Sequence, residues 1–299
     1  MVTLDIGCTL AWSPWVPHLG CWRGSTIPDV PGLYRIRRVG QSCLDYVGQT
    51  GKGEMTLRKR LGMQRGIYAA EMPYTDPHTA APALWALRQT AGVEFEVAAA
   101  PVPGSVPWRK GLEALAVALH RQEFGRSPTV NFGRMPAGFR KSSGNNRRLV
   151  EAGRRFRGSV CNTDEPHHAP GTPPAGPLTG DPGDDGWCGH AWSTWLPLDL
   201  ATAFPPPTAT GLYRIRAAAG DGLLYIGEGL VSARLIAHWR KSRRPGYPQG
   251  DVFGSAGQLE CSWVLNASWL SHQRLELECD LIGAHLLATA NVPLAQFRG

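Results

Sequence analysis

The sequence predicts an α+β protein with two similar domains in tandem, each a small antiparallel sheet flanked by helices. At 299 residues the chain is long enough for two domains that each bury their own core. The segment GLYRIR occurs at residues 32–37 and again at 211–216. In both copies, short segments typical of strands come before a segment in which apolar residues fall at helical spacing.

The internal repeat extends beyond this segment. Residues 8–17 match 188–197 at an offset of 180 residues, and the YVG of 46–48 matches the YIG of 225–227 at an offset of 179. A Leu-Glu pair and a later His recur at an offset of 165. Several matches in a nearly constant register are hard to obtain by chance, so the pattern indicates a duplication.

The repeat sets the expected domain boundaries. We expect domain 1 at 1–160, with an insertion and a basic C-terminal stretch, and domain 2 at 187–299. The change of offset gives domain 1 about fourteen extra residues, expected as a surface excursion within 62–108. Residues 161–186 are rich in Pro, Gly and Asp and contain no Lys or Arg. This composition predicts a flexible acidic linker.

Two adjacent strands are expected in each copy. In the first copy, residues 33–38 and 44–47 are short and flanked by turn-forming residues. A hairpin between them would bring Tyr34 and Tyr46 beside one site. The same spacing separates Tyr213 from Tyr225 in the second copy.

Helices are expected at about 54–66 and 231–242. A later helix is expected around Glu113, because Leu112 and Leu115, with further apolar residues, fall at helical spacing. This spacing leaves Glu113 at the edge of the buried stripe.

Positive charge is in excess and clustered. Lys and Arg number 31 against 24 Asp and Glu, and residues 109–157 hold twelve of these cations against three acids. Such a cluster favours an anionic partner, and Arg and Lys side chains are common contacts of nucleic-acid phosphates. The expected phosphate-binding residues are Arg140, Lys141, Arg147, Arg148, Arg154, Arg155 and Arg157, with a second cluster of Arg240, Lys241, Arg243 and Arg244.

The cysteine pattern and hydropathy argue against secretion and membrane insertion. The seven cysteines are odd in number, scattered and never spaced as C-x-x-C, so a disulfide framework is not expected. The chain opens with no apolar leader and has no apolar run of about eighteen residues, which leads us to expect a cytoplasmic protein without membrane contact. A zinc site is disfavoured because the spacing of the candidate ligands matches no compact pattern. These candidates are Cys161, His167, His168, Cys188 and His190.

The order of the motifs resembles the GIY-YIG nuclease domain. Gly-Leu-Tyr and Tyr-Val/Ile-Gly on adjacent strands come before a helix Arg, a later helix Glu and a downstream Asn, over about 32–131 and 211–291. The resemblance implies a set of catalytic residues in each copy. They are Tyr34, Tyr46, Arg60, Glu113 and Asn131 in the first copy, and Tyr213, Tyr225, Arg234, His238, Glu278 and Asn291 in the second. The first copy departs from the pattern, with Gln64 where the second has His238.

The chemistry of phosphodiester hydrolysis accounts for these residue types. Carboxylates suit Mg²⁺ or Mn²⁺, so the resemblance implies Glu278 and Glu113 as metal ligands. Arg234 keeps its proton and can donate paired hydrogen bonds to phosphate. By the same resemblance Tyr213, aided by His238, takes the proton of the attacking water, its pKa lowered by the ion and the Arg. The sequence does not decide which residue is the base.

The expected function is a metal-dependent DNA endonuclease in restriction, defence or DNA repair. The two domains would form a pseudo-dimer within one monomeric chain and cut the two strands of double-stranded DNA. Two alternatives stay open: a DNA-binding protein with degenerate nuclease domains, and a one-centre nickase that uses domain 1 for recognition. The target sequence, and DNA against RNA, are left undecided.

Overall fold

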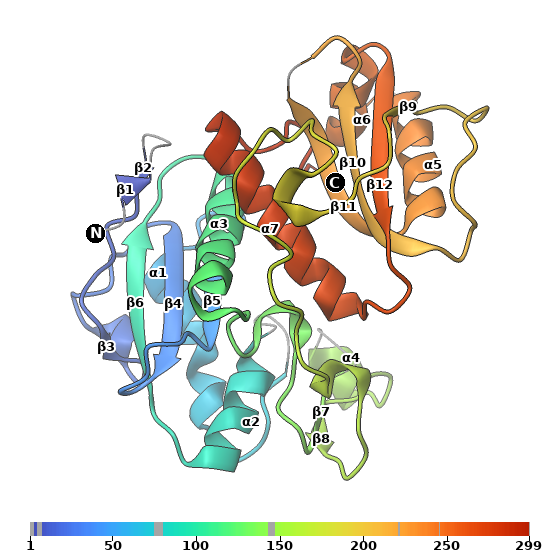
Figure 1. The fold of residues 1–299 in the computed structure, drawn as a ribbon. Helices are drawn as coiled ribbons and strands as arrows, with labels where there is room; N and C mark the ends of the chain where they lie inside the picture. The colour runs from blue at the N-terminus through green and yellow to red at the C-terminus, as the bar shows by residue number, and fades with distance from the viewer. Residues whose placement is uncertain are drawn as a thin grey trace. The chain divides into compact units, whose positions relative to one another are not determined.

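The computed structural model confirms the predicted α+β class: its two larger sheets are antiparallel and four-stranded (Figure 1). It groups the chain into two compact units. Apart from the first eight residues, the first unit contains 9–109 and 127–171, and the second contains 110–126 and 172–299. The structure describes residues 3–4, 8–74, 80–142, 147–220, 222–244 and 246–298.

The sheet of the first unit has the strand order β3-β6-β4-β5, with β4 between two antiparallel neighbours. Its strands are β3 (Val16–Pro17), β6 (Phe95–Pro101), β4 (Gly32–Arg38) and β5 (Tyr46–Gln49). Its helices are α1 (Leu57–Gly62), which continues as a 3-10 turn at Met63–Tyr68, α2 (Ala81–Ala91) and α4 (Arg147–Glu151). Strands β7 (Phe139–Arg140) and β8 (Ser159–Val160) form a separate hairpin, and β1 (Thr3–Leu4) pairs with β2 (Cys8–Thr9). Short 3-10 turns lie at Cys21–Arg23, Asn131–Gly133 and Pro166–His168.

The sheet of the second unit repeats this order as β9-β12-β10-β11. Its strands are β9 (Leu196–Pro197), β12 (Leu259–Leu265), β10 (Thr210–Ala217) and β11 (Leu223–Leu230). Its helices are α5 (Val231–Ser242), α6 (Pro248–Ser255) and α7 (Ser271–Thr289), with a 3-10 turn at Trp187–Gly189. From residue 110 onward, α3 (Val106–Phe124) belongs to this unit as well. None of the described helices is both long and apolar enough to cross a membrane.

The duplication reaches individual backbone hydrogen bonds. The amide of Ser13 donates to the carbonyl of Ala99 at 2.8 Å, and the hydroxyl oxygen of Ser13 accepts from the amide of Ala99 at 3.1 Å. Ser193 makes the same pair of bonds with Trp263, at 2.9 and 3.1 Å. The serine in each Trp-Ser-x-Trp segment therefore fixes the N-terminal arm of its copy, against β6 in the first unit and against β12 in the second.

The repeated tryptophans pack on the strand arginines. Because alternate strand residues point to opposite faces, the arginines of GLYRIR face away from its tyrosine. In the second unit the guanidinium of Arg214, which is fully buried, lies 4.4 Å from the ring centre of Trp192 and 4.5 Å from that of Trp195. In the first unit Arg35 lies 4.5 Å from the ring centre of Trp12. These cation–π stacks give the motif tryptophans a packing role.

Helix α2 lies within 62–108 but belongs to the repeat, because α6 takes the same place in the second copy, between α5 and β12. Leu84, Trp85 and Ala86 of α2 are buried in the core of the first unit. The indole N–H of Trp85 also donates to the carbonyl of Ala69 at 2.8 Å. Much of the extra length lies before α2, at 69–80 against 243–247 in the second copy, and Ala69, Ala70 and Glu71 are exposed there, as expected for a surface excursion. Residues 75–79 of the same stretch lie outside the described residues.

The two units differ from the expected boundaries in two places. Residues 110–126 group with the second unit rather than the first. Residues 172–186, part of the expected linker, also belong to the second unit. There the amide of Thr172 donates to Glu276 at 2.7 Å, and the carbonyl of Asp184 accepts from Arg214 at 3.0 Å. These carbonyl and amide groups satisfy buried charged side chains, a role that Pro/Gly/Asp composition does not reveal.

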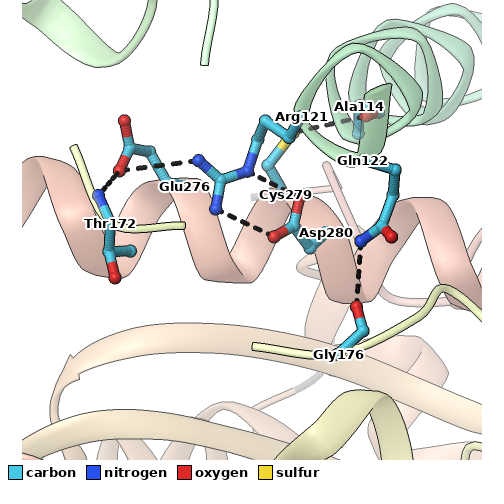
Figure 2. Close-up of polar contacts among 8 residues, drawn as sticks. All are labelled: Ala114, Arg121, Gln122, Thr172, Gly176, Glu276, Cys279 and Asp280. Carbon is cyan, nitrogen blue, oxygen red and sulfur yellow. Dashed lines mark hydrogen bonds and ion pairs between the residues drawn. The ribbon is translucent and has the colours of Figure 1, made fainter. Parts of the chain in front are cut away.

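Helices α3 and α7 pack against each other within the second unit (Figure 2). The thiol of Cys279 donates to the carbonyl of Ala114 at 3.4 Å. A Cβ added at Gly283 would lie 2.9 Å from the Cβ of Ala118. Each pair has the repeat offset of 165 residues, so equivalent positions of the two Glu-bearing helices meet each other.

An ion pair is buried between these two helices. Arg121 donates to both carboxylate oxygens of Asp280, at 2.8 and 3.0 Å, and lies 3.6 Å from Glu276 (Figure 2). Burial nevertheless raises the pKa of Asp280 to about 6, although Arg121 opposes the shift. At the positions that the repeat makes equivalent to Glu276 and Arg121, the chain has Gly111 and Leu286. This buried ion pair occurs once, not twice, in the repeat. It adds little stability, because taking the charges out of water offsets their attraction, but it fixes which positions of the two helices pair.

Candidate active site

The two tyrosines of the second unit meet across β10 and β11. Tyr213 pairs with Gly227 in the antiparallel register, and a Cβ at Gly227 would overlap the Tyr213 ring and lie 2.8 Å from Tyr225. A glycine is therefore needed here, and the rings stack with centres 6.0 Å apart. The predicted hairpin is confirmed, and it explains why the spacing of the two tyrosines is shared by both copies.

Helix α5 supplies two side chains to the Tyr213 hydroxyl. Arg234 Nε donates to Tyr213 Oη at 3.2 Å, and His238 Nε2 lies 2.9 Å from the same oxygen. Residues four apart lie on one face of a helix, so the spacing of Arg234 and His238 brings both to one hydroxyl. The predicted helix at 231–242 is confirmed with the same bounds.

Burial keeps this hydroxyl and this imidazole neutral. Desolvation lowers the pKa of His238 to about 3, with Lys241 and Arg234 adding to the shift. Burial also raises the pKa of Tyr213 well above its ordinary value, although Arg234 opposes the shift. The lowered tyrosine pKa expected from the sequence is thus not found in the protein alone, because desolvation outweighs the nearby guanidinium.

Glu278 on α7 completes the cluster. Its side chain is half-buried, and burial raises its pKa to about 8, with the Glu228 charge as the second cause and Arg234 opposing. Its charge in turn contributes to the raised pKa values of Tyr213 and Tyr225. Among the residues that the structure describes, none hydrogen-bonds or ion-pairs with the Glu278 carboxylate.

Glu228 is a site residue that the sequence reasoning missed. It lies on β11 and accepts from Arg274 Nε at 2.8 Å. The signal was present in the repeat, since the first copy has Gln49 at the equivalent position. Carboxylate oxygens are hard ligands of the kind that Mg²⁺ prefers, and among the described residues Glu278 has no cationic partner within hydrogen-bonding distance, whereas Glu228 is paired with Arg274. The residues present therefore fit a divalent cation at Glu278.

The downstream amide was assigned to the wrong residue in the second copy. Asn291 is exposed, and its side chain donates to the carbonyl of Thr289 at 2.9 Å, outside the cluster. Gln296 instead accepts from the amide of Ile226 at 3.0 Å, as Asn131 accepts from Val47 at 3.0 Å. Both amides fix the chain to the middle residue of Tyr-x-Gly. The offset of 165 residues pairs Asn131 with Gln296, so register rather than residue identity would have found it.

The first unit assembles a related but different cluster. The rings of Tyr34 and Tyr46 have centres 5.9 Å apart, and Gln64 Nε2 donates to Tyr34 Oη at 3.3 Å. Arg60 lies four residues before Gln64 on α1 and is half-buried. Glu113 lies in the segment that groups with the second unit, so within the first unit the structure brings together the tyrosines and Gln64.

Most of the expected phosphate-binding cations are exposed. They are Arg140, Lys141, Arg147, Arg148, Arg154 and Arg155 in the first unit, and Arg240, Lys241, Arg243 and Arg244 in the second. Arg157 differs: it is half-buried, donates to the carbonyl of Met72 at 2.8 Å and lies 3.1 Å from Glu71. Arg157 therefore has a structural role. Residues 143–146 of the basic stretch lie outside the described residues.

No protein-family model, curated protein or solved structure matches this chain. The resemblance to the GIY-YIG domain therefore depends on the repeated motifs themselves. Across the described part of the chain, no three or more His, Cys, Asp or Glu residues gather as a metal-binding group. The cation site considered above thus has one carboxylate beside a second that is already paired with an arginine.

Proposed function

We propose that the chain is a divalent-metal-dependent endonuclease that hydrolyses phosphodiester bonds in DNA, with the cluster of the second unit as its principal centre. The observation that carries the proposal is the convergence of Tyr213, Tyr225, Arg234, His238 and Glu278, which come from two strands and two helices. A carboxyl whose pKa is raised to about 8 beside buried tyrosines costs stability. Such costs concentrate at functional sites.

Glu278 would hold Mg²⁺ or Mn²⁺, with Glu228 adding negative charge nearby. A bound divalent ion supplies neutralising charge at the phosphate. Arg234 uses its Nε for Tyr213, and its side chain is exposed. The terminal nitrogens of its guanidinium would contact phosphate oxygens and stabilise the charge that develops in the transition state.

Proton transfer would pass through Tyr213. His238, which is neutral, lies 2.9 Å from the Tyr213 hydroxyl and would position it through a hydrogen bond. Once ionised, Tyr213 would take a proton from the attacking water while Arg234 holds its oxygen in place. Tyr225, stacked on Tyr213, would orient the phosphate or the water. A divalent ion held by Glu278 would supply positive charge that opposes the raised pKa of Tyr213.

The expected substrate is double-stranded DNA, cut by one monomeric chain that acts as an internal pseudo-dimer in restriction, defence or repair. The contact between equivalent positions of α3 and α7 supports this arrangement, because these helices carry Glu113 and Glu278. The exposed cations of both units supply the phosphate contacts that DNA binding needs.

A one-centre enzyme is the second candidate. Gln64 in place of a histidine, together with the exposed arginines of 140–155, favours a recognition role for the first unit. In that case only the second unit would cleave.

The test is incubation with supercoiled plasmid, with and without Mg²⁺ or Mn²⁺. We expect metal-dependent cleavage that falls by orders of magnitude in Glu278→Gln, while DNA affinity changes little. Glu123→Gln, the same exchange at an exposed position, should cleave as the wild type does. Plasmid that stays supercoiled while the protein binds it would favour a DNA-binding protein with degenerate nuclease domains.

A further inference from the structure

We propose that His18 is a positioning residue of the first unit: through Gln64 it holds the Tyr34 hydroxyl, whereas His238 contacts Tyr213 directly in the second unit. The role in cleavage rests on the proposed function. The hydrogen-bond relay itself does not. The repeated motifs do not include His18, because it lies in the N-terminal arm, outside the segments that resemble the GIY-YIG domain.

The relay has a defined direction. His18 Nε2 lies 2.7 Å from Gln64 Oε1, and Gln64 Nε2 donates to Tyr34 Oη at 3.3 Å. An amide oxygen only accepts, so His18 Nε2 carries the proton. His18 Nδ1 then accepts from the hydroxyl of Tyr68, which lies 3.2 Å away. His18, Gln64 and Tyr34 are fully buried, so each bond satisfies a polar group that would otherwise be costly.

Position 18 has a strict counterpart in the second unit. The amide of His18 donates to the carbonyl of Phe95 at 2.8 Å, and the amide of Leu198 donates to the carbonyl of Leu259 at 2.8 Å. The two residues therefore occupy equivalent places, His18 beside β6 and Leu198 beside β12. Leu198 belongs to the apolar cluster that contains Tyr213.

The two copies differ at both positions of this pair. The first has His18 with Gln64, and the second has Leu198 with His238. Each copy thus keeps one buried imidazole for its first tyrosine, delivered from a different segment of the chain. A glutamine opposite a leucine would lose the hydrogen bond that the imidazole donates to its amide oxygen. The identities at the two positions are therefore expected to be coupled rather than independent.

The exchange has a chemical consequence. His238 Nε2 can accept or donate the hydrogen bond to the tyrosine hydroxyl, according to its tautomer, whereas Gln64 Nε2 can only donate. Desolvation lowers the pKa of His18 to about 4, so the imidazole is neutral near pH 7 and acts through its hydrogen bonds. His18 fixes the orientation of Gln64 and hence of Tyr34, without receiving a proton from the site.

The first test is spectroscopic and uses the full chain. We expect ¹⁵N NMR to show His18 as the Nε2–H tautomer at pH 7, with its resonance assigned by its loss in His18→Gln. In Gln64→Leu this resonance should move, because its hydrogen-bond acceptor is gone. An Nδ1–H tautomer, or a His18 resonance that ignores the Gln64 change, overturns the relay even if the chain cleaves DNA.

The second test is a double-variant cycle made in Glu278→Gln, where any remaining cleavage comes from the first centre. His18→Leu should lower that cleavage about tenfold, and His18→Leu/Gln64→His, which copies the second unit, should restore it to within about threefold. A double variant no better than His18→Leu overturns the positioning role. If no variant in this background cleaves but the tautomer is as expected, the first unit is not a cleaving centre: the role of His18 in cleavage is overturned and the hydrogen-bond relay stands. If His18→Leu does not fold, folding of the double variant supports the coupling, and its failure to fold opposes it.

Discussion

The two units build the same tyrosine pair on the same strand order and then hold the first tyrosine by different means. In the second unit His238 contacts the Tyr213 hydroxyl directly, at 2.9 Å. In the first unit Gln64 contacts Tyr34, and His18 holds Gln64. The difference shows that a duplicated scaffold can preserve its backbone hydrogen bonds while its buried polar partners exchange places.

The carboxylates differ as well. Glu228 in the second unit has Gln49 as its counterpart, and the Gln49 side chain accepts from the amide of Gly51 at 2.5 Å instead of adding charge. Because Glu228 raises the pKa of Glu278, the second unit concentrates negative charge where the first holds a neutral amide. We therefore expect the second unit to bind a cation more tightly and to cleave faster.

The largest expected effect separates a two-centre enzyme from a one-centre enzyme. If both centres work, Glu113→Gln or Glu278→Gln alone should leave an enzyme that only nicks supercoiled plasmid, and the double variant should be inert. Wild-type digestion should show a transient nicked form, with the first unit as the slower centre. Gel analysis over time resolves these products. If Glu278→Gln abolishes nicking and Glu113→Gln still linearises fully, the first unit is a recognition domain.

The second prediction concerns how the affinity for a divalent cation depends on pH. A cation at Glu278 must displace the proton that a pKa of about 8 retains, so affinity for Mn²⁺ should rise about tenfold per pH unit between pH 6 and 7.5. Glu228→Gln, which copies Gln49, should move this dependence to lower pH. Calorimetric titration with Mn²⁺ measures it without cleavage. A pH-independent affinity would contradict the assignment of Glu278 as the ligand.

The sequence was sufficient for the fold class, the hairpins, the bounds of α5 and the tyrosine pairing, because these follow from short-range patterns that occur twice. It failed where a contact between residues far apart in the sequence decides which residue enters the site. Asn291 has the expected residue type, but Gln296 has the expected register. His18 and Glu228 enter their clusters through tertiary packing, and only a position-by-position comparison of the copies would have drawn attention to them.

A smaller effect tests which unit binds the phosphates. Replacing Arg147, Arg148, Arg154 and Arg155 by Ala should flatten the dependence of log affinity on log salt by roughly 0.9 for each phosphate that the variant no longer neutralises, because fewer counterions are released. The comparison is the same replacement of Arg240, Lys241, Arg243 and Arg244 in the second unit. Titration by fluorescence anisotropy at several salt concentrations gives both slopes. An unchanged slope in the first variant removes its arginines from the interface.

The smallest expected effect is on the free energy of unfolding. It measures how much stability the buried Glu278 carboxylate costs the second unit. The pKa of Glu278 is raised from 4.5 to about 8 on folding, so between these values the folded state binds more protons than the unfolded state. Stability should therefore fall as pH rises through this window. Glu278→Gln removes that term, and its melting temperature should exceed the wild type's by a few degrees at pH 8.5 but by less at pH 5.5.

Exposed Glu123→Gln should show no such pH-dependent difference. Saturating Mg²⁺ should reverse the order at pH 8.5, because a cation that binds only the folded wild type stabilises it and has no carboxylate to bind in the variant. Differential scanning calorimetry at the two pH values measures all of these terms. Equal shifts at both pH values would mean that the Glu278 carboxyl stays solvated. In that case the charge contrast between the two units has no thermodynamic basis, and the faster centre cannot be assigned from it.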